Sequence, residues 1–204
     1  MAFMVIQKYV NLSRLMVVVA FSAIGLGSCG NISSSSVAQT QPANKTFGDW
    51  CREKASLSPE TKHTVEVMLR EAETTECDAA DWKLSSLTNL DLANNKISDI
   101  KPLESLTKLT SLILDNNQIS DIKPLQSLTQ LTRLELKNNQ ISDIKPLASL
   151  TDLIGIVLDN NKISDITPLE SLTNLTWLFL SGNPIAPKTC PLKPESICDW
   201  EPIN

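Results

Sequence analysis

The chain has 204 residues, with 18 lysines and arginines against 23 aspartates and glutamates, and a formal net charge of -5 at pH 7. This acidic balance disfavours nucleic acid as a partner, because binding to phosphates needs a basic surface. The length suffices for one domain with a real hydrophobic core.

The first 28 residues differ in composition from the rest of the chain. They contain Lys8 and Arg14 but no acidic residue, and they carry an apolar stretch from Leu15 to Leu26. That stretch has the length of the apolar part of a secretory signal and is shorter than the roughly 20 residues that span a membrane. We predict that residues 1–28 are a signal peptide, whose removal changes the net charge from -5 to -7.

The predicted signal ends in Leu26, Gly27, Ser28 and Cys29, a sequence that resembles the bacterial lipobox. In such sequences diacylglycerol is attached to the cysteine and the chain is cut before it, so the resemblance implies that Cys29 becomes a lipidated N-terminus. We therefore expect a membrane-anchored lipoprotein of the bacterial cell envelope. Two alternatives remain, namely ordinary cleavage nearby, which gives a secreted or periplasmic protein, and a retained N-terminal anchor.

Two segments separate this signal from the repeats described below. Residues 29–46, rich in small polar side chains, have little to offset the entropy lost on ordering, which predicts a flexible linker.

Residues 47–86 are predicted to form an N-terminal helical cap, with a helix from about Pro59 to Thr74 that begins at the start signal Ser58-Pro59-Glu60. His63 lies on this helix, and we expect it to be solvated or to act as a cap.

A 22-residue period begins at Leu87. Successive units read LTNLDLANNKISDIKPLESLTK, LTSLILDNNQISDIKPLQSLTQ, LTRLELKNNQISDIKPLASLTD and LIGIVLDNNKISDITPLESLTN, and a shorter unit, LTWLFLSGNPIAP, follows them. The pattern resembles the 22-residue leucine-rich repeat of internalin-like proteins, over about Leu84 to Ile185. The resemblance implies an α/β solenoid, an open leucine-rich-repeat arc with five repeats over residues 87–185 and a short parallel β-sheet on its concave face.

Within each unit, the LxxLxL segment predicts a short strand whose leucines share one face and point inward. Proline recurs on the return side and predicts short helical or 3₁₀ turns in place of longer elements. One asparagine per unit falls where the chain leaves the strand, where a buried amide can bond the main chain of its own and neighbouring turns. This predicted asparagine ladder consists of Asn95, Asn117, Asn139, Asn161 and Asn183.

Four cysteines remain when Cys29 is set aside, two before the repeats and two after them. For an exported chain we favour local disulfides, Cys51 with Cys77 and Cys190 with Cys198, since each would close one end of the stacked repeats. Residues 186–204 would then form a C-terminal disulfide loop cap. Four free thiols are the alternative, and a metal site is disfavoured because the two pairs lie at opposite ends of an elongated fold.

The side chains that alternate with the strand leucines are expected to face outward on the concave surface. Trp177 and Phe179, beside Val157, form an aromatic and apolar group next to Gly155, a glycine that leaves room. The alternative is that the C-terminal cap folds over both aromatic rings. Beside it lies a charged band, Arg133, Glu135 and Lys137 flanked by Asp115 and Asp159, which could also take part in recognition. The alternative is that the band is a solvated surface held by cross-strand ion pairs. The candidate partner-binding residues are Ser111, Ile113, Asp115, Arg133, Glu135, Lys137, Val157, Asp159, Trp177 and Phe179.

Enzymatic activity is disfavoured, because a nucleophile needs a base and the only histidine lies on the cap helix. We expect no catalytic residue, no cofactor and no metal. The resemblance to internalin-like proteins implies a non-enzymatic module that binds another protein on its concave face, and we expect a monomer. The alternative is a passive structural lipoprotein of the envelope without a dedicated ligand on that face.

Overall fold

The structure is a computed structural model and describes residues 45–201. The expected signal peptide, the expected lipidation site Cys29 and all of the expected linker except its last two residues lie outside the described residues. Between residues 45 and 201, the protein has no helix with the length and apolar character needed to cross a bilayer.

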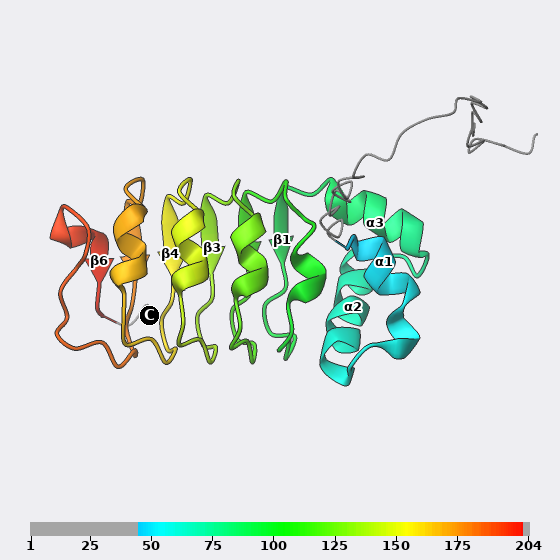
Figure 1. The fold of residues 1–204 in the computed structure, drawn as a ribbon, viewed down its shortest axis with the longest axis horizontal. Helices are drawn as coiled ribbons and strands as arrows, with labels where there is room; N and C mark the ends of the chain where they lie inside the picture. The colour runs from blue at the N-terminus through cyan, green and yellow to red at the C-terminus, as the bar shows by residue number, and fades with distance from the viewer. Residues whose placement is uncertain (1–44, 202–204) are drawn as a thin grey trace, which may run out of the picture. The chain divides into compact units, whose positions relative to one another are not determined.

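Six short strands form one parallel sheet in chain order (Figure 1). From β1 to β5, residues that pair across neighbouring strands are one repeat apart, as for Leu90, Leu112 and Leu134. The inward-pointing residues of β2 to β5, three leucines and Ile156, have no exposed surface, so the period of the sequence sets both the register and the core. The strands are β1 (Asn89–Asp91), β2 (Ser111–Ile113), β3 (Arg133–Glu135), β4 (Gly155–Val157), β5 (Trp177–Phe179) and β6 (Cys198–Asp199).

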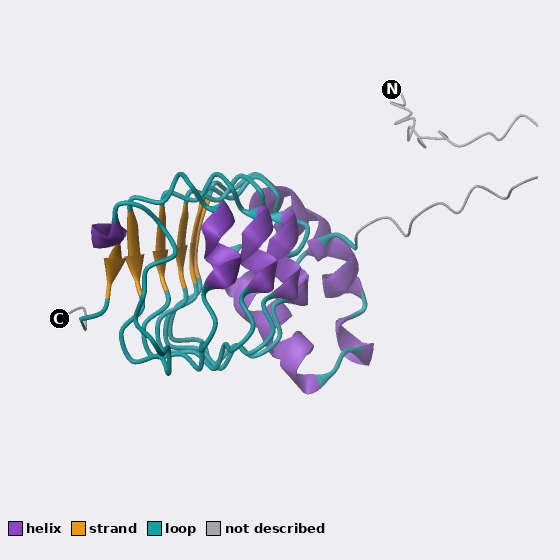
Figure 2. Cartoon of the chain, turned by 60° about the vertical axis from the view of Figure 1, so that its left-hand side comes forward, coloured by secondary structure: helices purple, strands orange, loops and turns teal. Residues whose placement is uncertain are grey.

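The return side of each repeat is a short 3₁₀ helix, as the recurring prolines predict. Each begins with a proline in its first turn, where the missing N–H costs no hydrogen bond. Figure 2 shows the strands and these turns as separate layers. The leucines and isoleucines of both layers fill the space between them. The turns are η2 (Lys101–Leu103), η3 (Lys123–Ser127), η4 (Lys145–Ser149) and η5 (Thr167–Ser171).

The predicted asparagine ladder lies where each strand ends. The Asn139 amide nitrogen donates to the carbonyl of Leu114 in the preceding repeat at 3.0 Å and to that of Leu136 at 3.1 Å, and its oxygen accepts from the Ile119 N–H at 3.0 Å. Asn117 makes the equivalent bonds one repeat earlier. Each amide therefore satisfies backbone groups of two successive repeats, which joins the repeats together.

A second asparagine row, which the sequence analysis did not single out, runs beside the first. Asn94, Asn116, Asn138 and Asn160 have positive φ angles, a conformation that asparagine tolerates better than most residues. The Asn138 amide donates to the Asn116 oxygen at 2.6 Å, and the Asn160 amide donates to the Asn138 oxygen at 2.8 Å. The Asn-Asn doublet of the first four repeats was the sequence signal for this row, and the fifth repeat has Gly182, also with a positive φ angle, in its place.

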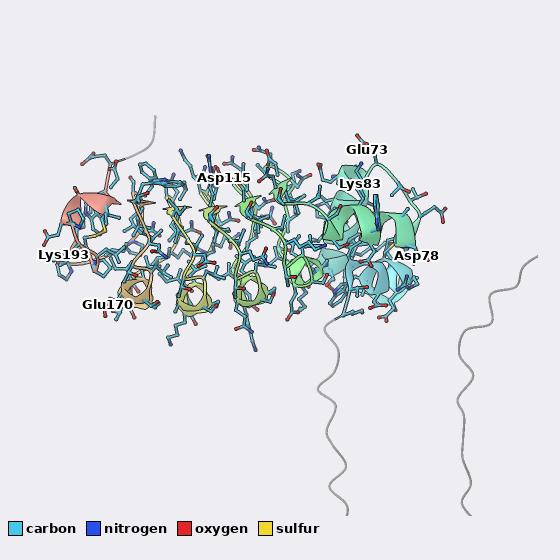
Figure 3. All side chains as sticks on the ribbon, turned by 90° about the horizontal axis from the view of Figure 1, so that it is seen from above. Glu73, Asp78, Lys83, Asp115, Glu170 and Lys193 are labelled. Carbon is cyan, nitrogen blue, oxygen red and sulfur yellow. A yellow bond between two sulfur atoms is a disulfide. The ribbon has the colours of Figure 1, made fainter. Side chains whose placement is uncertain are left out.

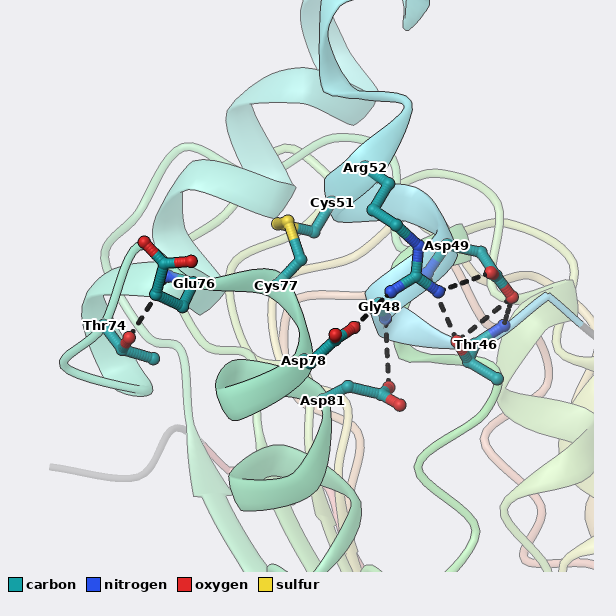
Figure 4. Close-up of a disulfide and its surroundings, with 10 residues drawn as sticks. All are labelled: Thr46, Gly48, Asp49, Cys51, Arg52, Thr74, Glu76, Cys77, Asp78 and Asp81. Atoms are coloured by element: carbon teal, nitrogen blue, oxygen red, sulfur yellow. Dashed lines mark hydrogen bonds and ion pairs between the residues drawn. A yellow bond between two sulfur atoms is a disulfide. The ribbon is translucent and has the colours of Figure 1, made fainter. Parts of the chain in front are cut away.

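The N-terminal cap contains more helix than the sequence predicted. It comprises α1 (Phe47–Arg52), a 3₁₀ turn η1 (Lys54–Ser56), α2 (Pro59–Glu71) and α3 (Cys77–Ser85). The Cys51–Cys77 disulfide joins α1 to α3 (Figure 4). It is one of the two disulfides that we favoured from the sequence. Beside it the Gly48 N–H donates to the Asp81 carboxylate at 3.0 Å, and Arg52 pairs with Asp49 and Asp78.

Helix α2 covers the first repeat through hydrogen bonds. The Thr61 hydroxyl donates to the Asp99 carboxylate at 2.6 Å, and the His63 ring nitrogen Nε2 lies 2.6 Å from the Asn95 carbonyl oxygen. His63 is thus half-buried and donates to the backbone, which corrects the expectation of a solvated residue or cap. Arg70 donates to the Asn95 side-chain oxygen at 3.1 Å. In later repeats the equivalent oxygen accepts from an N–H of the preceding repeat, so Arg70 takes the place of that donor at the first repeat.

The C-terminal cap is more than a disulfide loop. The Cys190–Cys198 disulfide, the second favoured pair, is present, and the chain returns through a 3₁₀ turn, η6 (Glu195–Ile197), into β6. β6 pairs in parallel with β5, with Leu178 opposite Cys198 and Phe179 opposite Asp199. The sheet therefore has one strand more than the five repeats predicted.

Candidate functional site

The outward side chains of β2 to β5 lie in two rows set by the strand register. One row contains Ser111, Arg133, Gly155 and Trp177, and the other contains Ile113, Glu135, Val157 and Phe179. Figure 3 shows Asp115 on this strand face, whereas Glu170 lies on the opposite side with the 3₁₀ turns. A hollow of about 570 Å³ opens on the strand face and is lined by Asp115, Arg133, Glu135, Lys137, Val157, Trp177 and Phe179.

Seven of the ten predicted residues thus line one hollow, and the other three do not. Ser111 and Ile113 are half-buried on β2, beyond the lining. Asp159 has only 1% of its surface exposed, which corrects the expectation that it is available to a partner on the outer face. Sequence alternation gave the direction of its Cβ but not the neighbouring side chains that cover it.

Trp177 occupies the space above Gly155. A Cβ atom added to Gly155 would lie 1.8 Å from the Trp177 ring atoms Cε2 and Cζ2, far inside van der Waals contact. The room that the sequence analysis expected beside the aromatic group is therefore filled by the tryptophan itself. Gly155 lets the indole lie across β4, so glycine at this position determines how Trp177 is presented.

The two aromatic rings form the apolar side of the hollow. Their centroids are 5.9 Å apart with the planes tilted by 45°, and Val157 lies buried opposite Phe179. Both rings are only half-buried, so within residues 45–201 the cap does not fold completely over them. A tilted aromatic pair of this kind offers a large apolar contact area at little conformational cost.

Arg133 connects the aromatic side to the charged side. Its guanidinium carbon lies 5.9 Å from the centroid of the Trp177 ring, and its Nε donates to the Glu135 carboxylate at 2.6 Å. The Arg133 side chain remains 55% exposed, whereas that of Glu135 is 13% exposed. Arg133 is therefore the more exposed member of this ion pair.

Two aspartates flank Lys137 at the same edge of the sheet. The Asp115 carboxylate accepts from the Lys137 N–H at 2.8 Å, yet burial, with the nearby Glu135 charge, raises the pKa of Asp115 to about 6. Burial likewise raises the pKa of Asp159. Neither carboxylate oxygen of Asp159 has a hydrogen-bond partner among residues 45–201.

A raised carboxyl pKa destabilises the fold at neutral pH, and this can be tested with Asp115→Asn. The folded-state pKa of about 6 lies above the ordinary value of 3.8 for an aspartate, so the wild type gains stability as the pH falls through 6 and has gained it fully below 3.8. Because Asp115 is only half-buried, we expect Asp115→Asn to raise the free energy of unfolding at pH 7 by only about 1 kcal/mol. The advantage should shrink below pH 6 and vanish near pH 4. Denaturant unfolding at several pH values measures it, and a carboxyl ¹³C titration of Asp115 with a midpoint near 4 would contradict it.

The chemistry of the hollow suits contact with a macromolecule. It is open and combines an aromatic pair with exposed positive charge, and its carboxylates are engaged or covered. No group of three or more histidine, cysteine, aspartate or glutamate side chains is placed to hold a metal ion in the part of the chain that the structure describes.

Comparisons with known proteins agree with the repeat architecture. Residues 85–128 and 129–171 match the family model for leucine-rich repeats (2 copies). The solved structure of an internalin C2 from Listeria monocytogenes is 44% identical, with a TM-score of 0.54, and the match covers 58% of this chain and 52% of that one. A second internalin from Listeria monocytogenes is 26% identical, with a TM-score of 0.52, over 73% of this chain and 48% of that one.

The chain therefore spans about half the length of these internalins. A comparison with curated proteins finds no match. Leucine-rich-repeat proteins generally mediate protein–protein interactions, and internalin-like proteins are typically interaction modules without enzymatic activity. The repeats, the parallel sheet and the similarity to these structures together show a leucine-rich-repeat solenoid, of which residues 85–171 match the family model for leucine-rich repeats.

Proposed function

We propose that this chain is a non-enzymatic module that binds another protein in the hollow of its strand face. The observation that carries the proposal is the arrangement of Trp177 across Gly155, with Phe179 on one side and Arg133 on the other. Tryptophan, tyrosine and arginine dominate the energetics of protein interfaces, especially where they cluster at the centre of a contact. A structural protein without a ligand has no need of a half-buried aromatic pair and an exposed arginine at variable positions of an otherwise regular repeat.

Site-specific cross-linking of the full chain in its native cells tests this proposal. A photoreactive benzoylphenylalanine in place of Phe179 should give a discrete cross-linked adduct with a partner protein. The same residue in place of Glu170, on the opposite side of the solenoid (Figure 3), should give none. Adding Trp177→Ala or Arg133→Glu to the Phe179 variant should lower the adduct yield roughly tenfold or more.

Thermal unfolding of the same variants supplies the control, because lost binding is informative only where the fold persists. Trp177 is half-buried, so we expect Trp177→Ala to leave a cooperatively folded protein. Adducts that form equally from Glu170, or that persist in both variants, would instead favour the passive structural alternative.

We further propose that the module is exported and tethered to the bacterial envelope through a lipid on Cys29. The basis is the sequence alone, namely the apolar segment that ends in Leu26-Gly27-Ser28-Cys29 and the polar linker after it. Cys29→Ser should move the protein from the membrane fraction to the soluble fraction. Unchanged fractionation of this variant would remove the lipid tether from the proposal.

A further inference from the structure

The last strand of the sheet brings an acidic side chain to the edge of the aromatic pair. β6, at the end of the sheet (Figure 1), pairs with β5 so that Asp199 lies directly opposite Phe179, on the same face. Asp199 is exposed, and its Oδ1 accepts from the Glu201 N–H at 2.9 Å. A backbone N–H holds the carboxylate in place without cancelling its charge, so a negative charge borders Phe179.

Arg133 and Lys137 lie on the other side of the aromatic pair. Arg133 belongs to β3 and pairs with Glu135, and Lys137 follows the same strand. Because β4 and β5 separate β3 from β6, the charge toward β3 is mixed, whereas the charge that borders Phe179 toward β6 is acidic. Lysines of the C-terminal cap have partners within the cap, namely Lys188 over the Trp200 ring and Lys193 with Glu195.

A buried carboxyl group adds to the acidity at this edge. Asp159, two residues after the end of β4, is 1% exposed, and neither of its oxygens has a hydrogen-bond partner among residues 45–201. Burial, together with the Asp199 charge, raises the pKa of Asp159, although the Lys137 charge opposes this shift. Asp159 and Asp199 therefore lie close enough to repel each other, and a cation brought to Asp199 favours the ionised form of both.

The two sides of the aromatic pair thus suit different groups of a partner. The half-buried rings of Trp177 and Phe179 offer apolar area to an apolar side chain. A lysine or arginine beside that side chain can lay its stem along Phe179 and bring its charge to Asp199. Arg133 repels a cation on the β3 side, so the basic group is directed toward β6.

We propose that the occupant is a protein segment that places an apolar side chain on Trp177 and Phe179 and a neighbouring lysine or arginine against Asp199. This inference rests on the proposed function, because it names the chemistry of the partner at the same face. It adds Asp199, which lies outside the lining of the hollow, as a residue that determines specificity.

A random dodecapeptide library displayed on phage tests this chemistry without knowledge of the natural partner. Selection on the immobilised full chain should enrich peptides with an apolar residue next to lysine or arginine. The enriched peptides, synthesised with a fluorescent label, are then titrated against variants. Enrichment of acidic or uncharged peptides, or of none, overturns the inference.

Asp199→Asn removes the charge and keeps the fold, because an asparagine oxygen can still accept from the Glu201 N–H. Its Tm should equal or exceed that of the wild type, since the repulsion with Asp159 is lost. We expect it to bind the selected peptide about three- to tenfold more weakly. The matched control is Asp143→Asn. Asp143 is also exposed, accepts from the Lys145 N–H at 3.0 Å and lies just before η4 on the return side, so this change should leave binding unaltered.

A charge exchange tests whether the two groups face each other. Asp199→Lys should weaken binding of the selected peptide at least about tenfold, because like charges then meet. A peptide with glutamate in place of its selected basic residue should bind the wild type weakly and regain affinity for Asp199→Lys. Asp143→Lys changes the net charge equally and should produce neither effect. Equal responses of both lysine variants would mean that only the net charge matters, and would overturn the inference.

The outcomes separate this inference from the proposed function. Peptides that lose binding with Trp177→Ala but bind both Asp199 variants normally would overturn the inference and leave the function standing. Peptides unaffected by Trp177→Ala would count against both. Sedimentation velocity that shows a concentration-dependent dimer, abolished by Asp199→Lys, would overturn the inference in favour of a second copy of the chain as occupant.

Discussion

Replacing Asn139 by alanine is expected to lower the free energy of unfolding by about 3 kcal/mol, more than any surface substitution discussed above. Asn139 is 8% exposed, and its amide bonds the Ile119 N–H and the Leu114 and Leu136 carbonyls. Alanine cannot reach these groups, and a buried donor or acceptor left without a partner costs about 1–3 kcal/mol. For a domain of this size the loss corresponds to a decrease in Tm of roughly 6–12 °C.

The neighbouring residue supplies a matched control. Asn138 belongs to the second asparagine row, is half-buried and has a φ of 56°, so Asn138→Gly removes its side-chain bonds while keeping a conformation that glycine adopts freely. We expect this change to cost less than about 1 kcal/mol in urea unfolding. If Asn138→Gly and Asn139→Ala destabilised the protein equally, the buried amide would not be the source of the effect.

The contrast between the two asparagines shows why so much of the repeat could be predicted. The 22-residue period fixes the strand register, the inward leucines and the buried ladder, because each depends only on a residue's position within its own repeat and on the identical position in the next. Asn139 and Leu134 have the same surroundings as Asn117 and Leu112. Repetition makes a local pattern sufficient for tertiary structure.

Where repetition ends, the sequence predicted less. β6 has two residues and no alternating pattern, so its pairing with β5 could not be foreseen from Cys198 and Asp199 alone. In the N-terminal cap, His63 has a single partner in the first repeat, which no periodic signal indicates. The cap elements are specified by individual contacts between segments distant in sequence.

The candidate site falls between these cases. Strand alternation predicted which side chains leave the sheet on the outer face, and most of them do line one hollow. It could not predict that Asp159 would be covered or that Trp177 would fold over Gly155, because both depend on side-chain conformations and on volumes in the neighbouring repeat. Direction follows from backbone periodicity, whereas exposure depends on what packs alongside.

The dependence of Trp177 on Gly155 leads to the second large expected effect. In the wild type, Gly155→Ala places a methyl group where the indole lies, 1.8 Å from two ring atoms, so the ring must leave β4. We expect a destabilisation of about 1–3 kcal/mol, typical of an overpacked site. We also expect a red shift in tryptophan emission and a loss of partner binding as large as that of Trp177→Ala.

In the Trp177→Ala background the same substitution should have the opposite sign. With the indole removed, a methyl group at position 155 has space, and alanine in a strand is more stable than glycine by about 0.5–1 kcal/mol. Gly155→Ala should therefore stabilise the Trp177→Ala protein slightly, which gives a coupling energy of about 1.5–4 kcal/mol in a double-mutant cycle. Additive effects would mean that the indole does not rest on Gly155 in solution. In that case Gly155 would not determine how Trp177 is presented to a partner.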